Sequence, residues 1–151
     1  MRKVAFFAVV LALAVTAVAF AQAKPDFSGT WVLDPAKSDQ MGGPGGGGGR
    51  GAGMGGPMTI KHAGTDFAMT RGENTTTYKL DGTEQAVTMG QGTAKATAKV
   101  EGDKVVIKTV RETPNGSMET TATYSLSADG KELTVVNSSQ RGDRKMVYTK
   151  Q

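Results

Sequence analysis

The residue types that most often do chemistry are scarce in this sequence of 151 residues. His62 is the single histidine and cysteine is absent, so a nucleophile–base pair or a thiolate metal site has too few members. No serine stands in a nucleophile-elbow pattern, and no metal ligands accompany His62 at regular spacing. The sequence therefore predicts no enzyme activity, no metal and no cofactor, and His62 is interpreted as an ordinary strand or surface residue.

A glycine-rich tract over residues 41–57 is the next candidate, because backbone N–H groups can cradle phosphate. Eleven glycines fall between Gly42 and Gly56, but no Lys-Ser/Thr pair follows them and no helical pattern opens there. Arg50 alone is a poor electrostatic site for nucleic acid. We interpret the tract as a flexible loop, a spacer or a mobile cover over one end of the β-barrel that the strand pattern predicts below. The tripeptide at 141–143, Arg-Gly-Asp, is interpreted as a turn.

Aromatic and methionine side chains are the remaining candidates, because both suit a moderately apolar small ligand. The alternative is a packed core without a cavity, as in many small barrels. Small side chains at Ala94, Ala96, Ala98 and Ala122 favour spare interior room without excluding that alternative. The residues predicted to line the barrel interior and contact such a ligand are Trp31, Met69, Tyr78, Met89, Tyr124, Met146 and Tyr148.

Residues 1–23 have the pattern of an export signal, with a basic start and an apolar run. Ala-x-Ala patterns end at Ala21 and Ala23, and we expect cleavage after one of them. A permanent anchor is the competing interpretation, since about 17 apolar residues reach the lower limit for a span. Cleavage would leave one domain over residues 24–151, exported to the periplasm or beyond, with no stable membrane insertion.

The charge of this domain gives little indication of a partner. The formal net charge is +4, and removing Arg2 and Lys3 leaves +2, so binding to nucleic acid is not predicted. No pattern identifies a protein partner. Because cysteine is absent on an export route, the fold must be held by its core, which favours a closed sheet.

Turn signals arrive at strand spacing throughout the domain, for example Gly102-Asp103 and Asp129-Gly130. They separate ten short runs, several of which alternate apolar and polar residues as half-buried strands do. The first run, residues 28–33, should end at Asp34-Pro35 because proline cannot donate to a ladder. We predict an all-β, antiparallel up-and-down barrel of eight to ten strands.

Residues 27–33, Phe-Ser-Gly-Thr-Trp-Val-Leu, resemble the first-strand signature of the calycins: lipocalins, avidins and intracellular fatty-acid-binding proteins. The chain also resembles a loosely defined group of exported bacterial lipocalin-like proteins. The matching segments are FSGTW.LDPAKSD from residue 27, YKLDG from 78, DGK.LTV from 129 and VY.K from 147. This resemblance implies a lipocalin-like barrel with Trp31 closing one end.

Two departures limit what the resemblance implies. Fatty-acid-binding proteins have a helical lid where this chain has residues 35–57, and they hold a carboxylate with an inward arginine two residues before the final tyrosine. Met146 occupies that position, and no arginine lies on residues 118–126. We expect a fatty-acid carboxylate to lack its usual partner here.

The function hypothesis is a non-catalytic exported protein that binds a small apolar or amphipathic ligand in the barrel. The alternative is a structural or protein-interaction module of the cell envelope with a filled barrel.

Overall fold

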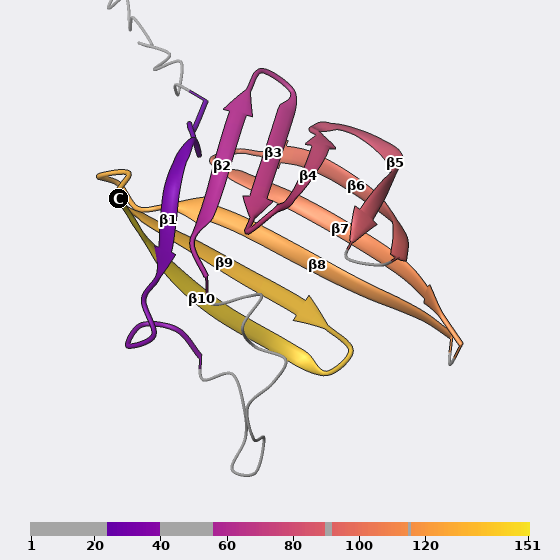
Figure 1. Ribbon diagram of the computed structural model, residues 1–151. Helices are drawn as coiled ribbons and strands as arrows, with labels where there is room; N and C mark the ends of the chain where they lie inside the picture. Colours follow the sequence, from indigo (N-terminus) through magenta and orange to yellow (C-terminus); the bar gives the residue numbers. More distant parts are fainter. Residues whose placement is uncertain (1–23, 40–55, 90–91, 115) are drawn as a thin grey trace, which may run out of the picture.

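The computed structural model describes residues 24–39, 56–89, 92–114 and 116–151. The predicted export signal and nearly all of the glycine-rich tract lie outside these residues. The described chain forms ten strands (Figure 1). Their bounds are β1 Gly29–Leu33, β2 Met58–Ala63, β3 Asp66–Arg71, β4 Asn74–Lys79, β5 Asp81–Met89, β6 Gly92–Glu101, β7 Lys104–Thr113, β8 Gly116–Leu126, β9 Glu132–Ser139 and β10 Gly142–Lys150.

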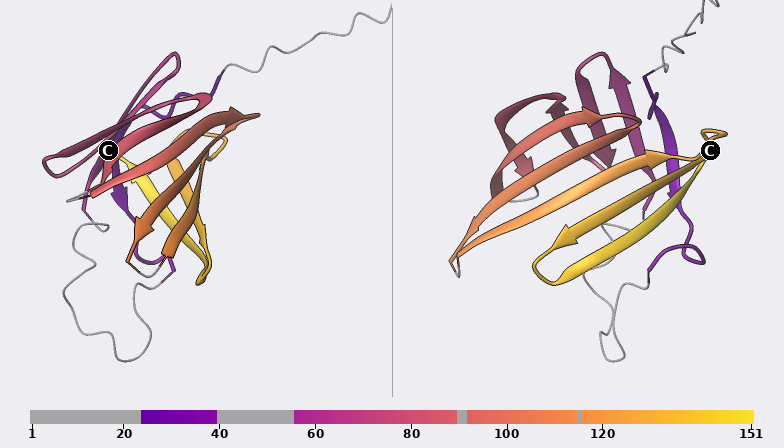
Figure 2. Two further views of the ribbon diagram at one scale, coloured as in Figure 1. Left: turned by 90° about the vertical axis from the view of Figure 1, so that its right-hand side faces the viewer. Right: turned by 180° about the vertical axis from the view of Figure 1, so that it is seen from behind.

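The strands form one antiparallel sheet in the order β4-β3-β2-β1-β10-β9-β8-β7-β6-β5. Consecutive strands are paired neighbours except for β4 and β5, and β1 pairs on its second side with β10 (Trp31 opposite Lys150). The sheet curls so that β2, β3 and β4 cross in front of the long strands β7 to β10 (Figures 1 and 2). The predicted all-β meander barrel is therefore confirmed, with ten strands in the described part of the chain.

Glycines make the tight turns that the sequence predicts. Gly64 and Gly102 have φ of 62° and 63°, a region that side chains with a β-carbon rarely adopt. They join β2 to β3 and β6 to β7 as hairpins with continuous pairing. Two-residue turns of this kind fix the register and so decide which side chains face the core.

β4 and β5 are also joined by a short turn, but no ladder pairing joins them. Instead, the side-chain amide of Gln85 substitutes for a strand partner. Its Oε1 accepts from the backbone N–H of Lys79 at 3.0 Å, and its Nε2 donates to the Lys79 carbonyl at 3.2 Å. Thr76 Oγ1 adds a bond to the Thr88 carbonyl at 3.3 Å. The strands on either side of the Asp81-Gly82 turn signal, β4 and β5, therefore form a seam of the barrel without ladder pairing. The pairing of β5 with β6 shifts register between Asp81 and Glu84.

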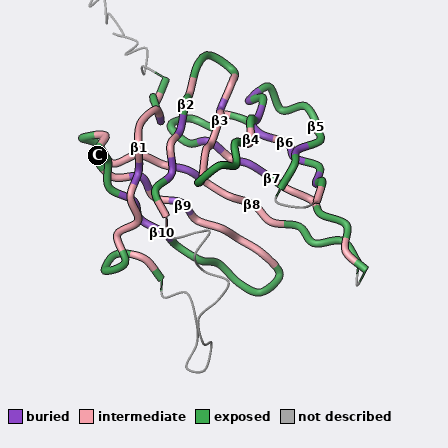
Figure 3. The backbone as a smooth tube through the Cα atoms, viewed as in Figure 1, coloured by how far each residue is buried: buried purple, intermediate pink, exposed green. Residues whose placement is uncertain are grey.

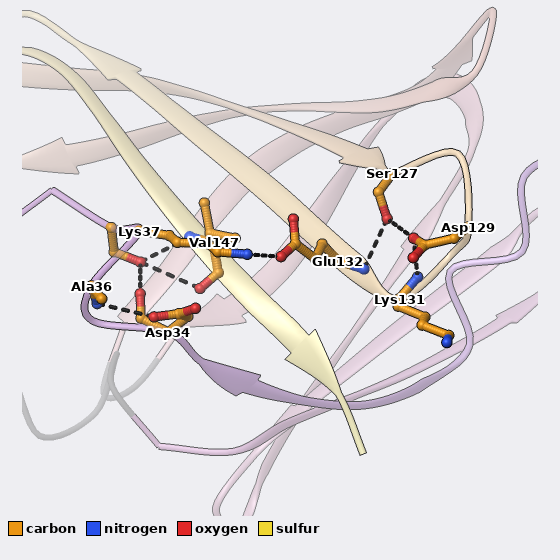
Figure 4. Close-up of polar contacts among 9 residues, drawn as sticks. Asp34, Ala36, Lys37, Ser127, Asp129, Lys131, Glu132 and Val147 are labelled. Carbon is orange, nitrogen blue, oxygen red and sulfur yellow. Dashed lines mark hydrogen bonds and ion pairs between the residues drawn. The ribbon is translucent and has the colours of Figure 1, made fainter.

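The segment after β1 lies along the edge of β10. β1 ends at Leu33 as expected, and the following residues continue its hydrogen bonding irregularly. Asp34 N–H donates to the Val147 carbonyl at 2.8 Å, and Val147 N–H donates to Ser38 Oγ at 2.9 Å. Lys37 extends from this segment to pair with Glu132 (Figure 4). Val147 points away from the barrel interior and is nevertheless buried, because this segment covers it.

Alternation places one side chain in two inside the barrel, where they form a single core cluster. Figure 3 shows the buried positions in purple along the strands. Trp31, Phe67 and Tyr148 are fully buried in it. The Trp31 indole N–H donates to the Phe27 carbonyl at 3.0 Å, which turns the ring toward the start of β1. Gly29 makes room for this arrangement, since a β-carbon there would lie 2.6 Å from Cε of Lys150, whose Nζ lies 5.5 Å from the Trp31 ring centroid.

Candidate ligand-binding site

Three tyrosines meet in the barrel interior from three strands, Tyr78 on β4, Tyr124 on β8 and Tyr148 on β10. Tyr78 and Tyr124 alternate with polar residues on their strands, and each of the three tyrosines is at most 4% exposed. Burial raises the pKa of Tyr78 and, more strongly, of Tyr124, while the nearby charge of Arg71 opposes both shifts. The Tyr78 and Tyr124 phenols are therefore neutral donors held in an apolar interior at ordinary pH.

Methionine sulfurs lie next to these hydroxyls. The Tyr124 hydroxyl donates to Sδ of Met69 across the barrel at 3.7 Å, and the Tyr148 hydroxyl donates to Sδ of Met146 at 3.6 Å. A thioether is a weak acceptor, so these bonds position the rings without holding the hydroxyls tightly. Of the residues predicted to line the interior, Trp31, Tyr78, Tyr124, Met146 and Tyr148 belong to the core, and Met69 packs against it.

Met89 is the exception among the predicted interior residues. It ends β5 and is 38% exposed, and it is not a member of the core cluster. Met118 near the start of β8 is similar at 42%. Met89 is the last residue of β5 and Met118 is the third residue of β8, so both lie near strand ends, where alternation alone does not bury a side chain.

Arg71 is a site residue that sequence reasoning missed. It ends β3 two residues after Met69 and four after Phe67, which puts all three on the inner face. Its Nη2 donates to Sδ of Met58 at 3.2 Å and to the Tyr148 hydroxyl at 3.4 Å. The guanidinium carbon lies 5.9 Å from the Tyr148 ring centroid. The alternation in β3 is the sequence signal that indicates its inward position, whereas the arginine of fatty-acid-binding proteins is expected on the last strands.

The interior differs between the two ends of the barrel. The aromatic end, defined by Phe27, Trp31 and Phe67, is sealed: the rings of Phe67 and Phe27 meet edge to face at 5.9 Å, and all three are fully buried. His62 belongs to this group through its ring contacts with Phe27 and Phe67, each at 5.8 Å.

The arginine end, defined by Arg71, Arg111 and Arg144, is more polar. By alternation its inner face also carries Thr109, Thr120 and Asn137, all of intermediate burial. Arg111 and Arg144 are exposed, and no carboxylate shares this inner face among the described residues. The barrel wall thus changes from sealed and aromatic to accessible and cationic along its length.

A surface hollow of about 330 Å³ lies beyond this end, at the tips of the β7–β8 and β9–β10 hairpins. Thr113, Met118, Gln140 and Arg141 are among the residues that line it. It is separate from the tyrosine cluster, and it contains none of the residues predicted for the interior.

The described residues contain no group of three or more His, Asp or Glu side chains that could hold a metal ion. No helix in the same part of the chain has the length and apolarity needed to cross a bilayer.

Similarity to known proteins lies in structure and not in sequence. No family model matches the sequence, and no curated protein matches it either. Lipid binding protein 8 of Caenorhabditis elegans has a similar structure, with a TM-score of 0.61 and 15% identity over 83% of this chain and 95% of that chain.

The fold is of the calycin type. A fatty acid transporter, REP1-NXSQ, matches with a TM-score of 0.57 and 14% identity over 83% of this chain and 96% of that one. Secretory abundant heat soluble protein 4 of Ramazzottius varieornatus matches with a TM-score of 0.58 and 16% identity, covering 87% and 99%. At such low identity the shared property is the ten-stranded barrel of fatty-acid-binding type.

Proposed function

We propose that this protein binds a small apolar or amphipathic molecule inside its barrel and does no catalysis. The observation that carries the proposal is the accessibility of inward-facing side chains near the arginine end. Met69 and Ala122 point inward and pack against the core, yet both remain partly exposed. Solvent-accessible apolar surface on an inner face is what a ligand would cover.

Two further observations support this proposal. The interior combines apolar walls with a few polar hydroxyls, as small-molecule sites do. Two of the similar structures are of proteins named for lipid or fatty acid. A non-catalytic role fits the surroundings of His62, whose ring packs against Phe27 and Phe67.

We also propose export to the periplasm or beyond, which rests on residues 1–23 of the sequence alone.

A filled barrel that serves as an envelope interaction module is the second candidate. The complete burial of Trp31, Phe67 and Leu133 favours it, because these side chains leave little room at the aromatic end. The two candidates differ in what happens near Ala122: a carrier takes a ligand there, whereas a filled module does not.

The test is calorimetric titration of the purified protein with dodecanol, together with native mass spectrometry for a co-purified molecule. We expect saturable binding of about one molecule per chain. The variant Ala122→Phe should abolish that binding while the far-ultraviolet circular dichroism stays unchanged, because the ring occupies the accessible inner surface. Absence of both saturable binding and a co-purified molecule would favour the filled barrel instead.

A further inference from the structure

Arg71 carries a charge into the barrel without an acidic partner. Five ion pairs join described residues, and none of them includes Arg71. No polar or charged side chain of the described residues is buried in the core beyond the tyrosines, so the interior offers no carboxylate. A partly buried cation is costly unless it is paired, which makes this position unusual in a stable barrel.

The hydrogen bonds of Arg71 are also few and weak. A guanidinium has five N–H donors, but only Nη2 has acceptors among the described residues. One acceptor is a thioether and the other is a hydroxyl at the long distance of 3.4 Å. Most of the hydrogen-bonding capacity of this planar, bidentate group remains for a partner that the described residues do not supply.

The Tyr78 hydroxyl is a second unused donor in the same region. Tyr78 is 3% exposed, and its hydroxyl makes no hydrogen bond to any residue that the structure describes. Tyr78 lies opposite Phe67 in the β3–β4 ladder, so it shares the inner face of these two strands with Arg71, whose charge opposes the rise in the pKa of Tyr78. An oxyanion beside Arg71 would therefore meet a guanidinium fork and a neutral phenol donor.

We propose that Arg71 is the anchor for an anionic head group on the ligand, with the Tyr78 hydroxyl as an additional donor. The proposal rests on the proposed ligand binding and specifies its chemical class: an oxyanion on an apolar tail. The anchor comes from β3, not from the final strand, where Met146 stands. Arg71 is thus the residue that selects anionic over neutral amphiphiles.

The test compares three probes with the same twelve-carbon tail: dodecanoate, dodecyl sulfate and dodecanol. Calorimetry of the wild-type protein should show dodecanoate binding about 10- to 100-fold tighter than dodecanol, the range for hydrogen bonds to charged groups. Arg71→Gln should remove that preference by lowering the affinity for dodecanoate to about that for dodecanol. Arg144→Gln, which removes an exposed arginine from the same end, should change each affinity by less than about threefold.

Two further variants separate anchoring from folding. Tyr78→Phe removes an unbonded hydroxyl, so it should weaken dodecanoate binding several-fold at unchanged urea midpoint. Arg71→Lys keeps the positive charge and loses the planar, bidentate donors of the guanidinium. It should retain only part of the preference for dodecanoate over dodecanol. Binding of dodecyl sulfate as tight as that of dodecanoate supports a general oxyanion site, and binding of dodecanoate alone supports a carboxylate site.

The proposal is overturned if the wild-type protein binds dodecanol as tightly as dodecanoate, or if Arg71→Gln weakens both probes equally. Either result would leave ligand binding itself intact. Failure of all three probes to bind the wild-type protein would instead contradict the proposed function.

Discussion

At the aromatic end of the barrel the inward side chains are large, apolar and sealed from solvent, whereas at the arginine end they are smaller, more polar and partly accessible. Phe27, Trp31 and Phe67 have no exposed surface, while Met69 and Arg71, on the same strand as Phe67, are both partly exposed. One strand therefore passes from the sealed core to the accessible wall within four residues. The difference indicates that stability and the proposed ligand binding depend on separate parts of one interior.

The largest expected effect is on stability at the aromatic end. Trp31→Ala removes a fully buried ring and its hydrogen bond to the Phe27 carbonyl, and should lower the free energy of unfolding by about 3–5 kcal/mol. Urea unfolding followed by circular dichroism measures it, since the substitution removes the only tryptophan. The matched change at the other end, Arg144→Ala, should stay within about 0.5 kcal/mol. Equal losses would contradict the division into two regions.

A smaller effect comes from adding volume at a fully buried and at a partly exposed inward position, which lie on either side of Ile107 in the sheet. Ala98→Leu places three extra carbons in a fully buried position opposite Ile107 and should cost about 1–3 kcal/mol. Ala122→Leu adds the same volume at a partly exposed position on β8 and should cost less than about 1 kcal/mol. Urea midpoints of the two variants give the comparison. A larger loss for Ala122→Leu would show that the accessible wall is as tightly packed as the core.

The sequence was sufficient to predict the strands, because alternation and turn glycines are local signals. Trp31 could be placed in the core and the end of β1 at Leu33 for the same reason. The seam between β4 and β5 could not be predicted, because Asp81-Gly82 has the composition of a hairpin turn and the bridging role of Gln85 depends on the closed barrel.

The site was predictable in part. Tyr78, Tyr124 and Tyr148 lie far apart in sequence, and alternation correctly indicated that each faces inward. The contact of Arg71 with Tyr148 joins strands that are not neighbours, so no local pattern encodes it. Met89 shares the face of buried Val87 on β5 but is 38% exposed, and the alternation pattern does not indicate how far a side chain at a strand end is covered.

The smallest expected effect is a pH dependence of the free energy of unfolding. It distinguishes sealed from accessible parts of the interior, because only a buried phenol produces it. Burial raises the pKa of Tyr124 above its ordinary value of 10.0, so the unfolded chain loses this proton at lower pH than the folded protein. Its contribution to stability is complete below pH 10 and falls as the pH rises further, by about 1.4 kcal/mol at pH 11. Tyr124→Phe should cost about 1 kcal/mol at pH 7, for the lost bond to Met69.

Between pH 9 and pH 11 the wild-type protein should therefore lose about 1.4 kcal/mol more stability than Tyr124→Phe, as measured by urea unfolding at each pH. Tyr78, whose pKa is raised by burial to a lesser degree, contributes a loss of the same sign to both proteins and cancels in the comparison. Parallel pH profiles for the two proteins would show that solvent reaches the Tyr124 hydroxyl. The accessible wall would then extend past Met69 to the Phe67 ring, which lies 5.4 Å from Tyr124.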